Sequence, residues 1–456
     1  MTLEEQVILL IDENKKLREI ISNLEKHIQM QDKRISELED SLRKSKINKH
    51  SGNSSKPPSS DIFNRNRNQS LREITGKQSG GQPGHKGTSL QMIDNPDKVI
   101  ELSPNYCNKC GYSLEKEEVH FRCRRQEVNI PPISATVTEY RLNSKHCPNC
   151  GHHQESEFPS HISNNIQYGS NVASLVSYLS VYQYLPFRRL KELFKHIFNL
   201  DISEGTIDNI LRRMSEKALP VYARIKETIS QSSQVGSDET SVKVKGKKWW
   251  IWVWQTVNST YLSTSHSRGM AAIDSIFPDG LGKSILNSDR WAAQLGTKAS
   301  GHQLCIAHLL RDLNFIAEVD KIDWSKRLKV LLQKGLELKQ QESVCSYNNP
   351  EAMQLERELE ILLKEEIPKN RFKKTQVIQK SLLKHRDSIF KFLYHMDLPP
   401  DNNASERAIR NVKVKQKISG QFKTGEQVFC ILRSIIDTCK KRNYDVLLAM
   451  NSIANF

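Results

Sequence analysis

An apolar heptad repeat runs through residues 3–42. Ten of its twelve core positions are apolar; the a positions are Val7, Asn14, Ile21, Ile28, Ile35 and Leu42, and the d positions are Leu3, Leu10, Leu17, Leu24, Gln31 and Leu38. β-Branched residues at a with leucine at d favour a parallel two-stranded coiled coil, whose register Asn14 would fix. The alternative is a single amphipathic helix that packs on the rest of the chain. We predict that residues 1–45 form a coiled-coil dimerisation helix and that the protein is a homodimer.

Helical periodicity dominates residues 157–230. Within this segment, residues 188–198 and 206–214 have the pattern of two short helices joined by a tight turn, and the second helix ends in Arg212 and Arg213. Two such helices fit a helix-turn-helix that contacts DNA, although any two packed helices of a bundle share the pattern. Both arginines are therefore candidate DNA-binding residues.

The pattern changes to period two near residue 234. Three alternating runs predict a three-stranded antiparallel meander at residues 235–244, 249–254 and 261–264. A helix pattern follows at 270–276, and then a fourth strand that ends on Asp289. The order β-β-β-α-β is that of an RNase H-like nucleotidyl-transfer domain.

This catalytic domain is predicted in two parts. Residues 231–312 form the first part, and residues 399–456 add its C-terminal helices. Between them, residues 313–398 are charged and helix-patterned, which indicates an α-helical insertion. The predicted fold class is a multidomain α+β protein with an N-terminal coiled coil, a small zinc-ribbon-like module, a helical segment and an interrupted RNase H-like α/β domain.

Composition points to a nucleic-acid partner. The 456 residues have a formal net charge of +16 and only 37% hydrophobic residues, and the isoelectric point is near 9.3. Such a basic balance is typical of proteins that bind polyanions, although unrelated basic proteins share it. No apolar run reaches about 18 residues, so no membrane span is expected. The N-terminus has no apolar signal core, and we expect a cytoplasmic, nucleoid-associated protein.

Residues 46–98 are predicted to be a basic flexible linker. Residues 41–90 contain ten Lys and Arg against two acids, and Ser, Asn, Gly and Pro are frequent. Lys56 and Lys86 lie in turn-rich stretches that cannot build a core. The linker is either a solvated spacer or an arm that lies along DNA phosphates.

Two Cys-x-x-Cys pairs predict a zinc module at residues 99–156. Each pair is followed by glycine, and 36 residues separate them; the four cysteines are Cys107, Cys110, Cys147 and Cys150. In a reducing compartment such pairs are metal ligands, and four thiolates suit one structural Zn²⁺. Residues 136–142 alternate like a strand, so a small β-rich ribbon is expected. The neighbouring Cys123, His146, His152 and His153 are either substitute ligands or ordinary surface and packing residues.

Three acids stand out on this basic chain: Asp238, Asp289 and Glu406. Carboxylates along a nucleic-acid path weaken binding unless a divalent cation makes them part of the attraction. Each acid also has a simpler explanation. Asp238 fits a residue flanking a hairpin, Asp289 a strand-end turn, and Glu406 a capping-box glutamate. Competing acids are Glu239, Asp274, Asp279 and Asp401.

Glu406 lies near the start of a helix for which Asn403 is the predicted N-cap. In the capping-box alternative, Glu406 would reach back to Asn403 and pair with Arg410. On a helical wheel, Ala404, Ala408 and Val412 share one side. Glu406 shares the other side with three cations, Arg410, Lys413 and Lys417.

Several sequence boxes together carry a family resemblance. They are the leucine-rich N-terminus, Ser-Lys-Pro-Pro-Ser-Ser-Asp at 55–61, Gly-Gly-Gln-Pro-Gly-His-Lys-Gly at 80–87, the paired Cys-x-x-Cys module, and the stretches 238–240, 305–311 and 401–410. Over almost its whole length the chain resembles DDE transposases of the insertion sequence 66 family. The resemblance implies that Asp238, Asp289 and Glu406 are the DDE triad. In that family a tyrosine-rich stretch follows the second aspartate, whereas Asp289 is followed by Arg290 and Trp291.

The hypothesis that follows is phosphoryl transfer on double-stranded DNA, at transposon ends and target. Two Mg²⁺ (or Mn²⁺) ions about 3.5–4 Å apart would be held by the triad, and Arg407, Arg410, Lys413 and Lys417 would contact flanking phosphates. Accessory transposition proteins are further candidate partners. The alternatives are an RNase H-like nuclease without strand transfer and a non-catalytic zinc-containing DNA-binding protein. Cys305 and His308 offer only two ligands, so packing is their first interpretation, ahead of metal binding or DNA positioning.

Overall fold

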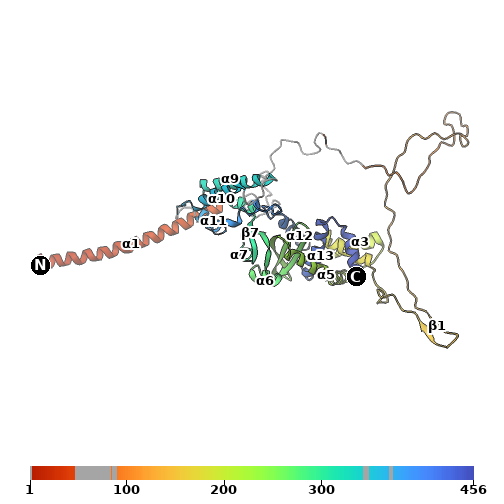
Figure 1. Cartoon of the computed structure of the whole chain (residues 1–456), viewed down its shortest axis with the longest axis horizontal. Coiled ribbons are helices and arrows are strands. Elements are labelled where there is room, and N and C mark those ends of the chain that lie inside the picture. Colours follow the sequence, from red (N-terminus) through yellow and green to blue (C-terminus); the bar gives the residue numbers. More distant parts are fainter. Residues whose placement is uncertain (1–2, 47–83, 85–89, 342–348, 369–372) are drawn as a thin grey trace.

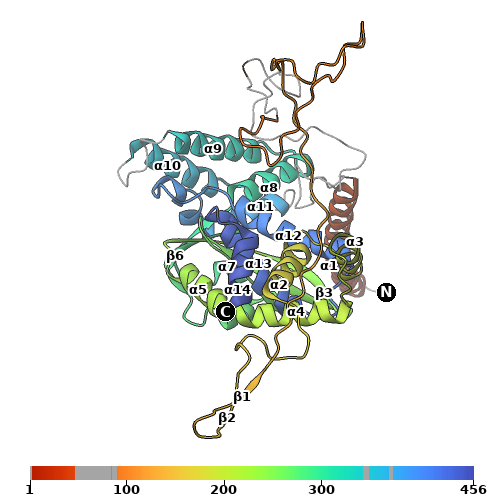
Figure 2. The same ribbon diagram turned by 90° about the vertical axis from the view of Figure 1, so that its right-hand side faces the viewer.

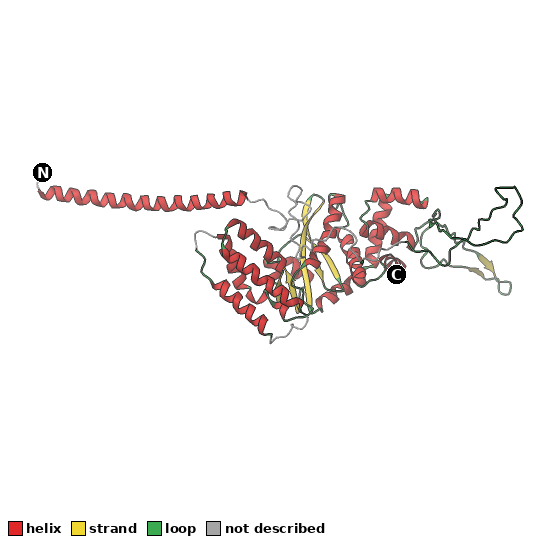
Figure 3. Ribbon diagram, turned by 90° about the horizontal axis from the view of Figure 1, so that it is seen from above, coloured by secondary structure: helices red, strands yellow, loops and turns green. Residues whose placement is uncertain are grey.

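The computed structural model describes residues 3–46, 84, 90–341, 349–368 and 373–456. It is a mixed α/β structure with a long N-terminal helix, a zinc-finger-like region and a mixed sheet between helices (Figures 1 and 3). The linker residues Lys56 and Lys86 lie outside the described residues. No helix within the described ranges is long and apolar enough to cross a membrane.

The N-terminal repeat forms a single helix, α1 (Leu3–Lys46), which extends away from the rest of the protein (Figure 1). The described apolar seam residues are each 54–56% exposed: Leu17, Ile21, Leu24, Ile28, Ile35, Leu38 and Leu42. The alternative in which this stripe packs on the rest of the chain is therefore wrong for these residues. A long apolar stripe in water favours association with another helix.

The zinc-finger-like region contains one short hairpin. Strands β1 (Ser144–His146) and β2 (His153–Glu155) pair antiparallel, with His146 opposite His153. The strand predicted at residues 136–142 is wrong, because these residues adopt neither helix nor strand. A strand needs backbone hydrogen bonds to a neighbour and an apolar layer to cover, and Val137 is 90% exposed.

A helical segment precedes the sheet, and the two predicted helices are confirmed within it. Ser203 caps the second helix by accepting a hydrogen bond from the Thr206 backbone N–H. The elements are α2 (Ser170–Ser177), a π-helical turn η2 (Tyr178–Tyr182), α3 (Phe187–Phe198), α4 (Glu204–Lys217) and α5 (Leu219–Ser230).

The sheet has five strands in the order β5-β4-β3-β6-β7. The predicted antiparallel meander β3-β4-β5 is confirmed, whereas β6 and β7 run parallel to β3. The strands are β3 (Gln234–Val244), β4 (Lys247–Gln255), β5 (Thr260–Ser265), β6 (Leu281–Ser288) and β7 (Ala299–Leu304), with helices α6 (Met270–Ile276) and α7 (Ala292–Leu295) between them. The predicted helix at 270–276 is also confirmed.

Three C-terminal helices complete this body: α12 (Asn403–Ser419), α13 (Glu426–Lys441) and α14 (Val446–Asn455). Helix α13 covers the edge strand β5 with hydroxyl groups. Ser434 Oγ accepts from the Leu262 N–H at 2.8 Å, and Thr438 Oγ1 accepts from the Thr260 N–H at 3.1 Å. An exposed strand edge invites unwanted pairing, and these bonds satisfy it within the chain.

The segment between β7 and α12 is helical, and its apolar side chains form a second cluster that also includes Ile285 of β6 and Leu304 of β7. Its helices gather on one side of the sheet (Figure 2). They are α8 (Ile306–Val319), α9 (Asp323–Gln340), α10 (Pro350–Lys364) and α11 (Lys373–Lys384), with 3-10 turns η4 (Arg386–Ser388) and η5 (Lys391–Leu393). Helix α8 runs through residue 312, where the sequence places the end of the first catalytic part.

Close packing between β3 and α12 generates a prediction at Gly236. A Cβ at this position would lie 2.7 Å from Gln255 Nε2, 2.7 Å from Ser405 Oγ and 2.9 Å from Asn402 Oδ1. We expect Gly236→Ala to lower the free energy of unfolding by about 1–3 kcal/mol through overpacking, measured by chemical denaturation. The control is Gly282→Ala on β6, where a Cβ meets no atom within 4 Å. Equal effects of the two substitutions would contradict the close approach.

Candidate active site

The register of the parallel strands places two acids side by side. Gly236 of β3 pairs with Asn287 of β6. Two residues further along each chain stand Asp238 and Asp289, and residues two apart in a strand point to the same face. Burial, and then the negative charge of Asp289, raise the pKa of Asp238 well above its usual value. Both acids therefore share one end of the sheet.

Amide side chains fasten the start of α12 to the same end. Asn287 Nδ2 donates to the carbonyl oxygens of Pro399 at 2.8 Å and Asp401 at 2.9 Å. Asn402 Nδ2 donates to the Ser237 carbonyl oxygen at 2.6 Å. Asn402, and not the predicted Asn403, is the N-cap residue of α12, and its side chain makes no capping bond because it is bonded to β3. These contacts fix the first turn of α12, which carries Glu406.

The capping-box alternative for Glu406 is wrong. Its Oε1 lies 3.3 Å from Arg311 Nη1 and 3.6 Å from His308 Nδ1, and both partners belong to α8. The carboxylate is thus directed toward the other acids and away from the start of its own helix.

His308 stands between Asp289 and Glu406. Its Nδ1 lies 2.8 Å from Asp289 Oδ1, but the contact is not aligned as a hydrogen bond, and both atoms are buried without a hydrogen-bond partner among the described residues. Burial opposes a charge on the imidazole, but Asp289 and Cys305 favour it more strongly and raise the pKa of His308 to about 11.

The three acids fit a divalent cation. Carboxylate oxygens are the hard ligands that Mg²⁺ and Mn²⁺ prefer. Asp289 Oδ1 is a buried oxygen without a hydrogen-bond donor in the described structure, and Asp238 and Asp289 repel each other when both are ionised. A cation between the two aspartates would bind the unpartnered oxygen of Asp289 and reduce the repulsion between the two carboxylates.

On the opposite face of β3, Glu239 is held by a cation. Arg268 Nε and Nη2 each lie 2.7 Å from Glu239 Oε1, and Gln294 Nε2 donates to Oε2 at 3.2 Å. The Glu239 side chain is only 4% exposed. This competing acid is therefore committed to an ion pair on the face away from Asp238.

Arg268, whose side chain is 41% exposed, also contacts two aromatic rings. Its guanidinium carbon lies 3.9 Å from the ring centre of Trp291 and 5.0 Å from that of Trp250, and Trp291 Nε1 donates to the Arg268 carbonyl oxygen at 3.0 Å. Glu239 follows Asp238, and Trp291 stands two residues after Asp289. Glu239, Arg268 and Trp291, here called the Arg268 clamp, thus tie together the backbones that carry two acids.

Of the four cations on α12 that are predicted to contact phosphate, three lie at the surface and one is bonded to the sheet. Arg407, Arg410 and Lys417 are exposed on α12. Lys413 is half-buried, and its Nζ donates to the Ser241 carbonyl oxygen at 3.0 Å; burial lowers its pKa, and Asp238 opposes that shift. Three of the four cations are therefore accessible to DNA.

The second predicted DNA-binding pair lies on α4. Arg212 Nε is bonded to Asp208 Oδ2 at 2.8 Å, one turn earlier on the same helix. Arg213 is exposed. The opposite side of α4 is buried in the core, with Ile207 and Met214 among its residues.

Each Cys-x-x-Cys pair forms a turn suited to zinc. The backbone N–H groups of Lys109 and then Cys110 lower the pKa of Cys107, and those of Cys150 and Asn149 lower that of Cys147. The glycine after each pair has a positive φ, +76° and +71°, as this tight turn requires. The donor set fits structural zinc. The two pairs are not gathered into one cluster in the described chain; modules of this kind take their folding energy from the metal.

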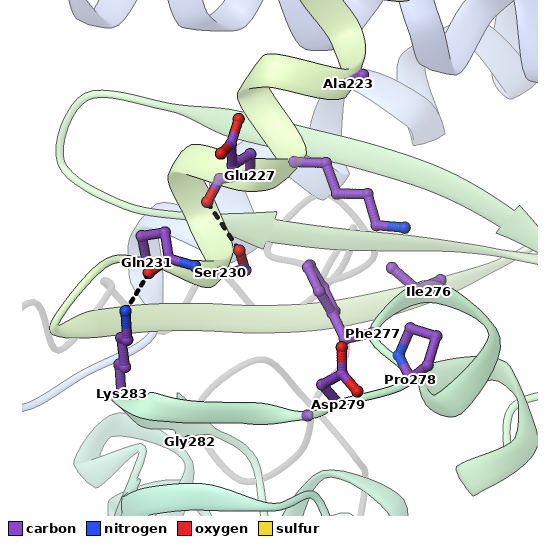
Figure 4. Close-up of a pocket in the computed structure, with 12 residues that line it drawn as sticks. Ala223, Glu227, Ser230, Gln231, Ile276, Phe277, Pro278, Asp279, Gly282 and Lys283 are labelled. Atoms are coloured by element: carbon purple, nitrogen blue, oxygen red, sulfur yellow. Dashed lines mark hydrogen bonds between the residues drawn. The ribbon is translucent and has the colours of Figure 1, made fainter.

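A cavity of about 450 Å³ lies between α5 and the start of β6 (Figure 4). Its lining includes Lys226, Phe277, Asp279 and Lys283. Lys283 precedes Asp289 by six residues on an extended strand, which is roughly 20 Å. The cavity and the competing acid Asp279 therefore belong to the opposite end of the sheet from the three acids.

Sequence reasoning left His308 and Arg311 without an assigned role at this site and missed Arg268. The spacing of Cys305 and His308 at the start of a helix was a usable signal, because residues three apart share a helix face. Arg268 carries no local signal, since its partner Glu239 is 29 residues away.

Comparison with known proteins identifies the family. The model for the transposase IS66 family matches residues 165–428, and that for the zinc-finger binding domain of transposase IS66 matches residues 104–151. A family of unknown function matches residues 5–91. A search of curated proteins found no match. Because the first match covers more than half of the chain and includes all three acids, the chain belongs to the IS66 family of transposases.

Proposed function

We propose that the protein cleaves DNA at the ends of an insertion sequence and transfers the strands in a Mg²⁺-dependent reaction. The observation that carries the proposal is the convergence of Asp238, Asp289 and Glu406 from β3, the end of β6 and α12 on one end of the sheet. Three carboxylates from separate elements around one point are suited to hold Mg²⁺ or Mn²⁺.

The strand arrangement supports an RNase H-like assignment for the sheet. The chain forms three antiparallel strands and then two strands parallel to the first, which stands in the centre. The parallel pairing of the first and fourth strands therefore places Asp238 of β3 level with Asp289, which directly follows β6. The helical stretch between β7 and α12 is then an insertion in this domain.

Bound metal would supply Lewis-acid activation of the attacking oxygen and of the phosphate. The residues of the chain orient the ligands. Arg311 holds Glu406, His308 lies between Glu406 and Asp289, and the Arg268 clamp supports the backbone of both aspartates. Arg407, Arg410 and Lys417 on α12 are placed to contact DNA phosphates beside the acids.

We further propose contacts with DNA outside this centre. Arg213, with Arg212, is the candidate contact of α4, and Lys56 and Lys86 those of the linker. The four cysteines hold structural zinc. Two copies associate through α1, which would bring two active sites to paired transposon ends.

The first prediction from this proposed function concerns the acids. We expect Asp238→Asn and Glu406→Gln to lower Mg²⁺-dependent cleavage of DNA carrying the element's ends by about 10³-fold, because metal activation contributes several kcal/mol. The control is Asp274→Asn, an exposed acid on α6. Near-normal rates in either variant would refute the assignment. Cleavage without joining would favour a nuclease, and DNA binding without any cleavage would favour a non-catalytic zinc-containing protein.

The second prediction concerns the Arg268 clamp. The double variant Glu239→Gln with Arg268→Met removes both charges and leaves no unpaired buried ion. We expect the Mg²⁺ concentration for half-maximal cleavage to rise about 10–100-fold, as for other outer-shell partners of metal ligands. The control is Arg327→Met, which removes an exposed ion pair with Glu365. A loss of rate that is equal at every Mg²⁺ concentration would indicate damage to the fold and not to ligand positioning.

The third prediction concerns assembly. We expect light scattering to show a dimer at micromolar concentration, and Ile21→Asn with Ile28→Asn to give a monomer, because each buried isoleucine contributes about 1.5–3 kcal/mol. Lys26→Asn with Lys33→Asn, outside the seam, is the matched control. A monomeric unmodified chain, or a dimer that survives the seam substitutions, would contradict assembly through α1.

A further inference from the structure

The proposed reaction gives no role to the Cys305 thiol, yet this thiol lies beside one of the acids. Among the described residues, Asp289, Cys305 and His308 form the one group of three or more His, Cys, Asp or Glu whose donor atoms all lie within 4.8 Å of one another. Cys305 is 1% exposed, whereas the side chains of His308 and Asp289 are 19% and 34% exposed. The cluster is thus buried on one side and open to solvent on the other.

Strand register and helix periodicity create this cluster. Ser288 of β6 pairs with Leu304 of β7, so that the next residue on each chain is Asp289 and Cys305. The Cys305 backbone N–H donates to the Ser288 carbonyl oxygen at 2.9 Å, and this bond joins the end of β7 to the end of β6. Cys305 is also the N-cap residue of α8, and His308 follows three residues later on the same face.

The donor set is that of a thiophilic metal. Tetrahedral Zn²⁺ has bonds of about 2.0–2.3 Å, so its ligand atoms stand about 3.3–3.8 Å apart. The Asp289 Oδ1–His308 Nδ1 distance of 2.8 Å has to open by about half an ångström, and the pairs with Cys305 Sγ, all within 4.8 Å, have to close by about 1.3 Å at most. Thiolate and imidazole favour Zn²⁺ over Mg²⁺. One thiolate and one carboxylate neutralise the dication, which suits a largely buried position.

We propose that Asp289, Cys305 and His308 bind a thiophilic divalent cation of the Zn²⁺ class, and that this ion excludes Mg²⁺ from Asp289. Binding releases two protons to solvent, one from the Cys305 thiol and one from the His308 imidazolium, because both ligands bind a metal in their deprotonated form. The exclusion rests on the proposed function of Asp289, whereas the binding does not.

The surroundings make this an exchangeable site. The Asn402 backbone N–H donates to Cys305 Sγ at 3.2 Å and supports a thiolate. Arg311 Nη1 lies 3.1 Å from His308 Nε2 and places positive charge beside the ion, which weakens binding. Three protein ligands also leave a fourth position open. This site therefore binds zinc less tightly than four thiolates do, and the fraction of sites that hold zinc depends on the free Zn²⁺ concentration.

Zinc content tests the binding. After equilibration with micromolar Zn²⁺ and gel filtration, elemental analysis should find one more zinc per unmodified chain than in Cys305→Ser or His308→Gln. Cys439→Ser, at a buried cysteine of α13, is the matched control and should keep the full count. Circular dichroism checks the fold, and His308→Gln decides if Cys305→Ser does not fold. An unchanged zinc count in the folded variants overturns the proposal.

Zinc inhibition tests the exclusion. At fixed Mg²⁺, micromolar Zn²⁺ should inhibit DNA cleavage, added Mg²⁺ should relieve the inhibition, and Cys305→Ser should need at least about tenfold more Zn²⁺ for the same fractional inhibition. Equal sensitivity of the variant overturns the exclusion. If the unmodified chain does not cleave DNA in Mg²⁺, the proposed function fails, whereas the zinc count still decides the binding.

Discussion

The parallel pairing of β3, β6 and β7 is the constraint on which the candidate site depends. These three strands are neighbours in the sheet, and their register places Asp238, Asp289 and Cys305 in neighbouring positions. A slip of one residue between β3 and β6 would turn Asp289 to the opposite face. Asn287 stabilises the observed register, because its amide donates hydrogen bonds to two carbonyl oxygens before α12, and a slip would break them. The same register therefore sets both the acids and the helix that delivers the third acid.

On this chain of net charge +16, ion pairs within the protein compensate the charge of individual acids near the candidate site. Glu239 is neutralised by Arg268 on one face of β3, and Glu406 is paired with Arg311 on the other. Asp238 is nearly buried among acids, and its charged form is unfavourable without a cation. Arg268 and Arg311 thus hold Glu239 and Glu406 in place, and the His308 imidazole lies 2.8 Å from Asp289.

Local patterns predicted what local forces determine. The heptads gave the long helix, and period-two alternation gave the meander, because both depend on nearby side chains. Alternation failed at residues 136–142, where no neighbouring strand completes the hydrogen bonds. Contacts between residues far apart in the sequence could not be predicted from local patterns. Arg311 and Glu406, for example, are 95 residues apart. The N-cap shift from Asn403 to Asn402 has the same origin, since a tertiary bond to β3 decides it.

Helix α8 packs in the second apolar cluster and also contacts the acids. Leu309, Leu313 and Ile316 pack in this cluster, whereas His308 contacts Asp289 after β6 and Arg311 contacts Glu406 on α12. The first turn of α8 is bonded to β6 through Cys305 and Ser288. A close-packed helix moves as a unit, so a displacement of α8 shifts the partners of Asp289 and Glu406 together. The geometry of the acids is therefore coupled to the helices between β7 and α12, which contribute none of the three acids.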